Sequence, residues 1–344
     1  MAKQRSAPTL NDVAQKAGVS TATVSRCLNS PDQVIEPTRK RVMEAVRELG
    51  YSPNFGGRAL AAKRTNTIGA IIPTMENAIF ARGVQAFQEE LRARGYTLLV
   101  ASSSYRADVE EDQIRTLIAR GADGLMLIGH DRDPSIYRFL ETQSVPALIT
   151  WTHMSDAEVP SIGFDNKKSM RELVDKVLDF GHRRIGVISA ETASNDRARA
   201  RVEAIREALR SPRYKDASVE IVETVYDIDA GAVAFRDLMS TATPPTAILC
   251  GNDVIAAGAL RQARVMGLDV PNDVSVTGFD DIELARIVTP ALTTVHVPHR
   301  EMGTQAARQL IEMVEKNAPG QTIEIPAQVC LRDSLGPPPS ACSP

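Results

Sequence analysis

The spacing of apolar residues changes along the chain, from an N-terminal stretch with a helical period to a longer region of alternating patterns. In residues 10–17 and 37–49, apolar side chains recur three and four positions apart, which places them on one face of a helix. From Thr67 onward, apolar runs such as "TIGAIIP" and "ADGLMLIGH" alternate with amphipathic stretches such as "NKKSMRELVDKVLDFG". This alternation is typical of parallel sheets with helices on both faces. The pattern predicts an N-terminal all-α head and an α/β body of two doubly wound parallel-sheet subdomains.

The head is predicted to begin with two short helices joined by a tight turn. Thr9 is expected to cap the first helix and Gly18 to end it, because glycine adopts a left-handed conformation without steric cost. Ser20 then caps a second helix, whose inward residues are Val24 and Leu28. Two short helices joined in this way are the signature of a helix-turn-helix, whose second helix enters the DNA major groove. A generic three-helix bundle is the alternative.

Side chains on the outward face of the second helix favour DNA binding over that alternative. Thr21, Ala22 and Ser25 are small and lie beside Arg26, whereas bulky residues would prevent close approach to a groove. Residues 1–64 contain eleven Lys and Arg and five Asp and Glu, a net charge of +6 in a chain whose total is −3, so the remainder carries −9. A basic head on an acidic body indicates a polyanionic partner, although charge alone fits a solvated basic face equally well.

Composition excludes several classes of protein. No apolar run approaches the roughly 18 residues of a membrane span, and the N-terminus lacks the apolar core of a signal peptide. No nucleotide-binding, zinc-protease or serine-hydrolase motif is present. We therefore expect a cytoplasmic, non-enzymatic protein without catalytic residues, metal, cofactor or membrane partner. The cysteines also lack metal or disulfide spacing; they are Cys27, Cys250, Cys330 and Cys342.

Polar and aromatic side chains follow several predicted strands of the body, where ligands of open α/β sheets bind. Trp151 follows "VPALIT", Asn252 follows "AILCG" and Asp280 follows "VTGF". Arg201 lies on the helix after "IGVISA". Asp280 can accept hydroxyl hydrogen bonds, Arg201 can donate a pair of them, and Trp151 can stack against a sugar face. In a cleft between the two subdomains, this set suits a polyhydroxylated ligand.

A structural role is the alternative for each such residue, because strand-end Asp and Asn often cap the next helix. We expect that role for Asp165, Asp253 and Asp281, and we expect His182 to be a turn residue.

The segment "NDRARAR" (residues 195–201) adds two more arginines. A spacing of four allows Arg197 and Arg201 to share a helix face, whereas Arg199 points elsewhere. Either added guanidinium could meet a carboxylate, which makes a sugar acid a candidate ligand. A solvated helix face is the alternative.

Three segments carry a resemblance to a known family: "TLNDVAQKAGVSTATVSRCLN", "TRKRVMEAVRELGYSPN" and "RALA". They resemble the lactose/galactose repressor (LacI/GalR) family of transcriptional regulators, and the resemblance extends along nearly the whole chain. It implies a periplasmic-binding-protein-like body and a homodimer. The domains expected from it are a helix-turn-helix (1–52), a hinge helix (53–64), a first effector-binding subdomain (65–163 with 295–325), a second one (164–294 with 326–336) and a disordered tail (337–344).

The resemblance also assigns roles to the residues of the head. It places Thr21, Ala22 and Arg26 against base edges, where Arg26 could pair with a guanine and Ala22 could meet a thymine methyl group. Glu36 stands where the family usually has a Ser or Thr cap, and its carboxylate can also cap the third helix. The residues expected to bind phosphates or to cap helices are Thr9, Ser20, Thr23, Ser25 and Asn29.

In the family, the segment that matches Asn54 to Ala62 is a hinge that becomes helical in the minor groove of the operator. Leu60 occupies the position that wedges open a base step, and Arg58 lies beside it. Gly56 and Gly57 disfavour a helix in the absence of DNA, so DNA and the partner hinge would have to drive its ordering. A plain Gly/Ala linker is the alternative.

The resemblance supports the cleft residues position by position. Arg201, Asn252 and Asp280 match effector-contacting residues of the second subdomain, and Ile79 and Phe80 match contacts of the first. Two further positions depart from the lactose repressor: Trp151 replaces an acid, and His299 replaces an aromatic residue. These departures imply a different ligand and a pocket shifted towards stacking.

The sequence thus predicts a repressor of carbohydrate-utilisation genes that a sugar or sugar acid releases from a palindromic double-stranded DNA operator. A corepressor-dependent or activating regulator of the same family is one alternative. A solute-binding transport protein is another, disfavoured by the basic head and the absence of an export signal. The C-terminal "LRDSLGPPPSACSP" has no leucine heptads, so we expect a homodimer and not a tetramer.

Overall fold

The computed structural model describes residues 7–52, 64–76 and 78–339. The chain forms two compact units, a head unit (Met1–Thr65) and a body unit (Asn66–Pro344). The head unit contains α1 (Leu10–Ala17), α2 (Thr21–Asn29), the 3-10 helix η1 (Pro31–Gln33) and α3 (Glu36–Leu49).

Local hydrogen bonds explain where the first two head helices begin and end. The hydroxyl of Thr9 accepts a hydrogen bond from the backbone N–H of Asp12 at 3.3 Å. In return, the carboxylate of Asp12 accepts one from the backbone N–H of Thr9 at 2.7 Å. Gly18 ends α1 at a φ of 64°, and Ser20 caps α2 through the N–H of Thr23. The predicted helices, caps and turn of the helix-turn-helix are confirmed.

Apolar side chains from all three helices form the core of the head unit, in which Val13, Val24 and Val42 are fully buried. The expected cap of the third helix is wrong. Helix α3 has Ile35 at its N-cap position without a side-chain cap, and Glu36 is already its first helical residue. From there the Glu36 carboxylate reaches the Arg39 guanidinium one turn further along the helix.

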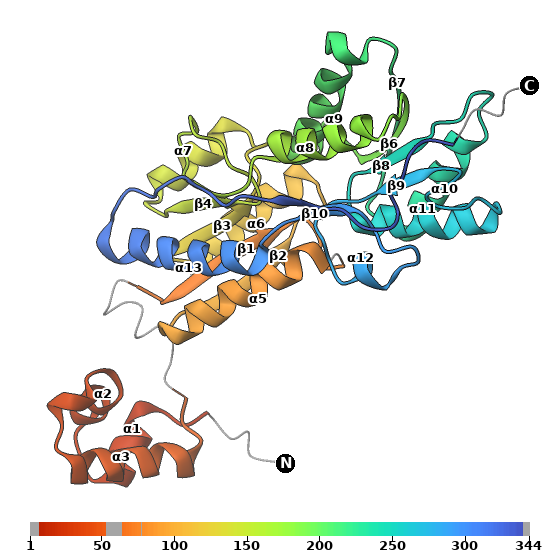
Figure 1. The fold of residues 1–344 in the computed structure, drawn as a ribbon. Coiled ribbons are helices and arrows are strands. Elements are labelled where there is room, and N and C mark those ends of the chain that lie inside the picture. The colour runs from red at the N-terminus through yellow and green to blue at the C-terminus, as the bar shows by residue number, and fades with distance from the viewer. Residues whose placement is uncertain (1–6, 53–63, 77, 340–344) are drawn as a thin grey trace, which may run out of the picture. The chain divides into compact units, whose positions relative to one another are not determined.

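The body unit contains two parallel sheets and one short antiparallel ribbon (Figure 1). The first sheet has the order β11-β5-β4-β3-β1-β2, with β1 (Thr67–Ile72), β2 (Thr97–Ser102), β3 (Gly124–Ile128), β4 (Ala147–Thr150), β5 (Ser161–Gly163) and β11 (Ile323–Glu324). The second has the order β7-β6-β8-β9, with β6 (Arg184–Ala190), β7 (Ser218–Thr224), β8 (Ala247–Cys250) and β9 (Ser275–Thr277). The ribbon pairs β10 (Thr294–His296) with β12 (Gln328–Cys330).

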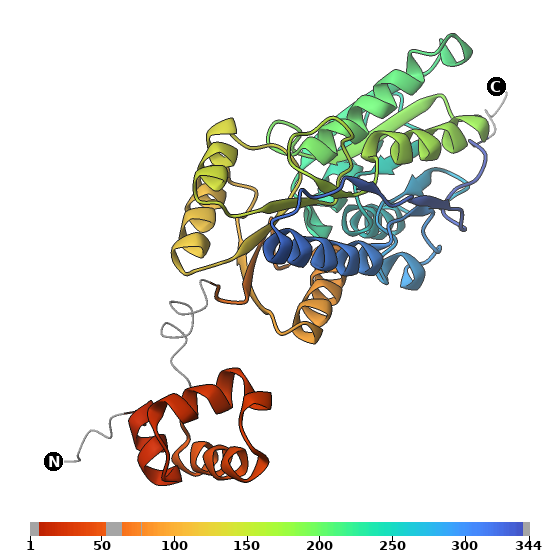
Figure 2. The same ribbon diagram turned by 90° about the vertical axis from the view of Figure 1, so that its left-hand side faces the viewer.

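Helices cover both faces of each sheet. In the first half of the body, α5 (Ala78–Ala93) and α13 (His299–Lys316) lie side by side on one face, opposite α6 (Ala107–Ala119) and α7 (Pro134–Thr142) (Figure 1, Figure 2). In the second half, α8 (Asn166–Asp179) and α9 (Asp196–Leu209) lie opposite α10 (Ile228–Met239) and α11 (Asp253–Val265). The remaining short helices are η2 (Pro212–Tyr214) and α12 (Leu284–Ile287).

Burial on both faces explains why the strands are almost continuously apolar. Successive residues of β1 point to opposite faces, so Ile68 and Ala70 pack with α5 and α13 whereas Ile71 packs with α6. One core cluster also continues from the first half into the second, since it includes Met126 of β3 and Val187 of β6. The predicted fold class is confirmed. Of the helices in the described ranges, not one has both the length and the apolar surface of a membrane span.

The C-terminal segment returns to the second sheet and is held there by buried polar groups. The N–H of Val276 donates to the carbonyl of Ser334 at 2.9 Å. His182, fully buried at the turn before β6, contacts the Thr246 hydroxyl at 2.9 Å and the Gly336 carbonyl at 2.8 Å. His182 is thus structural, and burial lowers its pKa.

Each of the three aspartates expected to be structural stabilises local backbone or side chains. Asp165 caps α8, and Asp253 accepts from the N–H of Ile282 at 2.8 Å. Asp281 accepts from Arg332 at 2.6 Å and from His296 at 2.9 Å, which joins the segment after β12 to β10. Although burial acts in the opposite direction, hydrogen bonds from Arg332 and His296 hold the pKa of Asp281 below its ordinary value.

We predict that Asp281→Asn lowers the free energy of unfolding by about 1–3 kcal/mol, because it leaves the half-buried Arg332 without an ionised partner. The loss should be fully present above the ordinary pKa of 3.8. It should shrink as the pH falls below that value and disappear once the pH has passed the lower pKa of folded Asp281, where the wild-type side chain is protonated as well. Urea denaturation measures both effects. Asp237→Asn is the matched control because Asp237 pairs with Arg236 in solvent. Equal urea midpoints for the two variants at neutral pH would contradict the prediction.

Candidate functional site

Helix α2 presents a small, accessible face. Thr21, Ala22 and Arg26 are exposed, whereas Val24 and Cys27 face the core. Two of the three exposed residues, Thr21 and Ala22, are small. Of the residues expected near phosphates, Thr9 and Ser20 cap α1 and α2, Thr23 and Ser25 are half-buried, and α2 ends at Asn29. Asn54, Arg58 and Leu60, together with the rest of the expected hinge, lie outside the described residues.

A small cavity lies between the two halves of the body, at the carboxyl ends of their strands. The predicted residues that line it are Ile79, Phe80, Trp151, Arg197, Arg201 and Asp280. We call it the inner cavity. Ile79 and Phe80 start α5, Trp151 follows β4, and Asp280 lies shortly after β9. Segments far apart in the sequence therefore meet here because parallel strands end at the same edge of a sheet.

Four lining residues were missed by the sequence analysis: Tyr105, Phe164, Asn195 and Tyr226. Tyr105 comes soon after β2 and Tyr226 soon after β7, so the rule that selected Trp151 and Asp280 could have found both. Asn195 caps α9 and begins the arginine-rich segment of residues 195–201.

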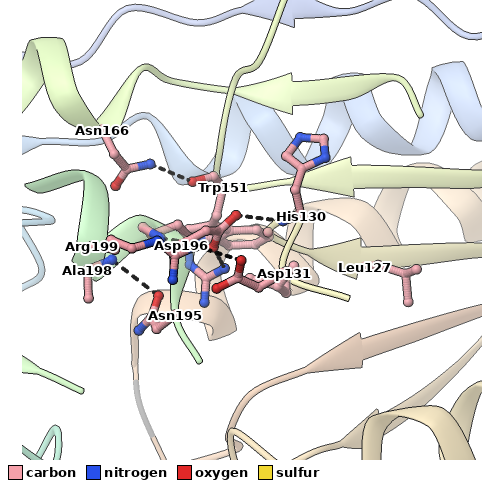
Figure 3. A network of polar contacts seen from close by, with 12 residues as sticks. Leu127, His130, Asp131, Trp151, Asn166, Asn195, Asp196, Ala198 and Arg199 are labelled. Carbon is pink, nitrogen blue, oxygen red and sulfur yellow. Dashed lines mark hydrogen bonds and ion pairs between the residues drawn. The ribbon is translucent and has the colours of Figure 1, made fainter. Parts of the chain in front are cut away.

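Arg201 is the centre of the polar contacts around the inner cavity. Its Nη1 donates to the Asn166 side-chain oxygen at 2.6 Å, and its Nη2 donates to the Tyr226 hydroxyl at 2.9 Å. The guanidinium carbon lies 4.7 Å from the centre of the Phe279 ring. Asn166 in turn donates to the Trp151 carbonyl at 3.1 Å (Figure 3). The buried Nε of Arg201 has no hydrogen-bond partner among the described residues, which leaves a donor at the cavity.

Asp280 faces the same cavity from a left-handed backbone conformation, with a φ of 101°. Burial raises its pKa to about 7, although the positive charges of Arg201 and Arg197 act in the opposite direction. Near neutral pH, the carboxyl group can therefore either accept or donate a hydrogen bond.

The indole of Trp151 is packed within the protein and does not offer an open ring face. Only 2% of the residue is exposed, and its ring meets Phe80 edge to face with 5.3 Å between ring centres. The His299 ring lies on another side, 6.1 Å away. The stacking proposed for Trp151 is therefore not available in this conformation. Its Nε1 is instead a buried donor without a partner in the described part of the chain.

Asn252 and His299 are buried and are not among the described residues that line the inner cavity. Asn252 is fully buried and caps α11 through the N–H of Ile255 at 2.9 Å. The Nε2 of His299 lies 3.3 Å from the carbonyl oxygen of Asp280. Burial lowers the pKa of His299 to about 4, so the ring is neutral and supports the backbone that carries Asp280.

A second polar network ties the start of α9 to the loop after β3 (Figure 3). Arg199 pairs with Asp131 at 2.6 Å, and the carboxylate of Asp196 accepts from the N–H of His130 at 2.6 Å. Arg197 pairs with Asp196 at 2.8 Å and also lines the cavity. Arg197 and Arg201 thus share a helix face, as expected, while Arg199 points elsewhere. Because the loop belongs to the first half and α9 to the second, this network joins the halves.

Backbone strain gathers at the strand ends around the cleft. Ser104, Tyr105, Trp151, Asp280 and Asp281 all have φ values between 52° and 101°. For residues other than glycine, this region costs about 1–2 kcal/mol each. Such strain persists where the surrounding structure enforces it, and it is common at functional sites.

The cavities of the cleft differ greatly in size. The inner cavity has a volume of about 20 Å³, enough for roughly one water molecule. Two outer cavities of about 300 and 620 Å³ adjoin it. A sugar-sized ligand therefore requires the inner cavity to open. Among the described residues, no group of three or more His, Cys, Asp or Glu side chains is arranged to hold a metal ion.

Comparison with known proteins agrees with this division of the chain. Residues 9–54 match the family described as bacterial regulatory proteins, lacI family, and residues 174–335 match a periplasmic binding protein-like domain. The solved lac repressor dimer bound to operator and the anti-inducer ONPF is 28% identical, with a TM-score of 0.83, over 96% of this chain and 100% of that one. The CelR–cellobiose complex is 28% identical, with a TM-score of 0.67, over 95% of this chain and 99% of that one.

A curated relative extends the similarity over almost the whole sequence. The transcriptional repressor CytR of Escherichia coli K12 is 34% identical over 319 residues, which cover 91% of this chain and 92% of CytR. The chain therefore belongs to the lacI family of bacterial regulatory proteins, and it is a DNA-binding transcriptional repressor and not an enzyme.

Proposed function

We propose that this repressor controls carbohydrate-utilisation genes and leaves a palindromic operator when a sugar or sugar acid occupies the inner cavity. The observation that carries the proposal is the set of buried groups that converge there. The Nε of Arg201 and the Nε1 of Trp151 are donors without described partners, and the Asp280 carboxyl group lines the same space. Buried donors are rarely left unpaired, and a ligand with several hydroxyl groups would satisfy them. The similarity to a CelR–cellobiose complex supports this ligand class.

We propose that Thr21, Ala22 and Arg26 contact DNA bases. The exposure of these three side chains on one face of α2 supports this assignment. The residues that we propose to bind phosphates or to cap helices are Thr9, Ser20, Thr23, Ser25 and Asn29. Two copies of the head unit would read two half-sites, and their hinges (residues 53–64) would meet in the minor groove. The similarity to a lac repressor dimer on operator supports a homodimer. A repressor of this kind acts in the cytoplasm.

The direction of the response depends on which body conformation the effector prefers. An effector changes DNA affinity only to the extent that it binds the two conformations differently. We propose that the closed body conformation is the one that binds operator. A ligand too large for the closed inner cavity would then favour separated halves and would release the operator. This is the reason to propose release here and not corepression.

The single tryptophan provides a direct test. Monosaccharides, disaccharides and sugar acids are screened for changes in Trp151 fluorescence, and each hit is tested for release of operator DNA. The proposal requires at least one compound that changes both signals. Compounds that change the fluorescence but tighten DNA binding would instead support the corepressor alternative.

We predict that Arg26→Ala removes most of the preference for operator over random DNA, because a bidentate guanidinium–guanine contact contributes about 1–3 kcal/mol of discrimination. Arg26→Lys keeps the positive charge but loses the bidentate geometry of the guanidinium. It should therefore retain non-specific DNA affinity while losing the preference for operator over random DNA. Fluorescence-anisotropy titrations with operator and scrambled duplexes measure the ratio. A wild-type ratio in both variants would refute the contact.

We predict that Asp280→Asn abolishes effector-induced release while DNA affinity stays unchanged. In the wild type, effector affinity should rise with pH up to about 7 and level off above it, since ligand hydroxyl groups donate to the ionised carboxylate and burial raises the pKa of Asp280 to about 7. Asp280→Asn should lose this pH dependence, and the exposed Asp237→Asn control should keep it. Isothermal titration with a screened sugar, repeated across pH, distinguishes these outcomes.

A further inference from the structure

Tyr105 occupies a backbone position that tyrosine disfavours. The N–H of Arg106 donates to the carbonyl of Ser103 at 3.0 Å, which closes a four-residue turn after β2. Its two central residues, Ser104 and Tyr105, have φ values of 53° and 59°. Positive φ at both positions is the pattern of a type I′ turn, in which glycine and asparagine predominate. A bulky ring in this strained conformation indicates that the surrounding structure holds the ring in place.

The ring of Tyr105 meets a ring from the opposite half of the body. Tyr105 follows β2 of the first sheet, and Tyr226 follows β7 of the second. Their ring centres are 5.8 Å apart with an interplanar angle of 43°, within the range of favourable aromatic pairs. Tyr226 is also anchored by Arg201, which donates to its hydroxyl at 2.9 Å. The pair therefore bridges the cleft directly beside the proposed effector site.

The same two rings line cavities on both sides. Tyr105 and Tyr226 each border the inner cavity and the outer cavity of about 620 Å³, and Tyr105 also borders the outer cavity of about 300 Å³. The two tyrosines therefore lie at the boundary between the inner and outer cavities, together with Asn195 and Arg197, which also border cavities of both kinds. Trp151 borders only the inner cavity among these three, with 2% of its surface exposed.

We propose that Tyr105 and Tyr226 form an aromatic gate that separates the inner cavity from the outer ones and determines which molecules reach Arg201 and Asp280. The larger outer cavity has room for a sugar, whereas the inner one does not. A ligand that enters from outside must displace or replace the Tyr105 ring. The gate would select ligands for the effector site, so this inference rests on the proposed function.

Acrylamide quenching of the single tryptophan tests the gate with neither effector nor DNA. In the full-length protein, Tyr105→Asn should raise the quenching constant of Trp151 about two-fold, since it removes a ring that shields the inner cavity. Asparagine tolerates the left-handed conformation, and so does the glycine of a second variant, Tyr105→Gly, which should behave alike. Tyr105→Phe keeps the ring and should match the wild type.

Tyr137→Asn is the matched control, because Tyr137 is a half-buried tyrosine of the same half that lines none of the three cavities. It should leave quenching unchanged. Unchanged quenching in both Tyr105→Asn and Tyr105→Gly would overturn the gate, and so would an equal rise in Tyr137→Asn or Tyr105→Phe. Because the measurement requires no effector, a failed sugar screen would count against the proposed function alone, and normal quenching would count against the gate alone.

Discussion

The body unit depends on how a buried guanidinium is accommodated where its two halves meet. A desolvated charge is costly unless acceptors and an opposite charge surround it. Arg201, 8% exposed, obtains acceptors from Asn166 and Tyr226 and has Asp280 nearby. The side-chain amide of Asn166 in turn donates a hydrogen bond to the carbonyl of Trp151, which belongs to the first half. The hydrogen-bonding needs of one side chain thus help to fix the position of one subdomain against the other.

This arrangement satisfies the buried groups only in part, and the donors left over are available to the effector that we propose. Asp280 loses solvation in the same place, and burial raises its pKa to about 7, so at neutral pH it compensates the guanidinium incompletely. The Arg199–Asp131 pair and the Asp196–His130 contact hold the halves together from the outside of this cluster. A ligand that satisfies the inner donors better than the closed protein does would compete with these outer contacts.

Patterns in the sequence predict most of the residues that line the inner cavity, but they do not predict the side-chain contacts around it. Alternating strand and helix patterns placed Trp151, Arg201 and Asp280 at strand ends or on the next helix, and these residues do meet, because parallel strands end together. The packing of the Trp151 indole against Phe80 and beside His299 involves three distant segments, so no local pattern encodes it. Asp196, which pairs with Arg197, is also held by the N–H of His130 from a distant segment. Helix α3 begins at Glu36, the residue that was expected to cap it.

The distribution of hydrophobic cores has a consequence for how such regulators can be rearranged. The head unit closes a core of its own around Val13, Val24 and Val42, whereas one apolar cluster of the body continues from β3 into β6. Exchanging one half of the body for that of a relative would place foreign side chains inside a shared interior. The core cluster of the head unit, in the described part of the chain, draws only on residues of that unit. A head unit from another family member would bring its own core with it, so recombination near Thr65 could join a new DNA specificity to the effector response that we propose for the body.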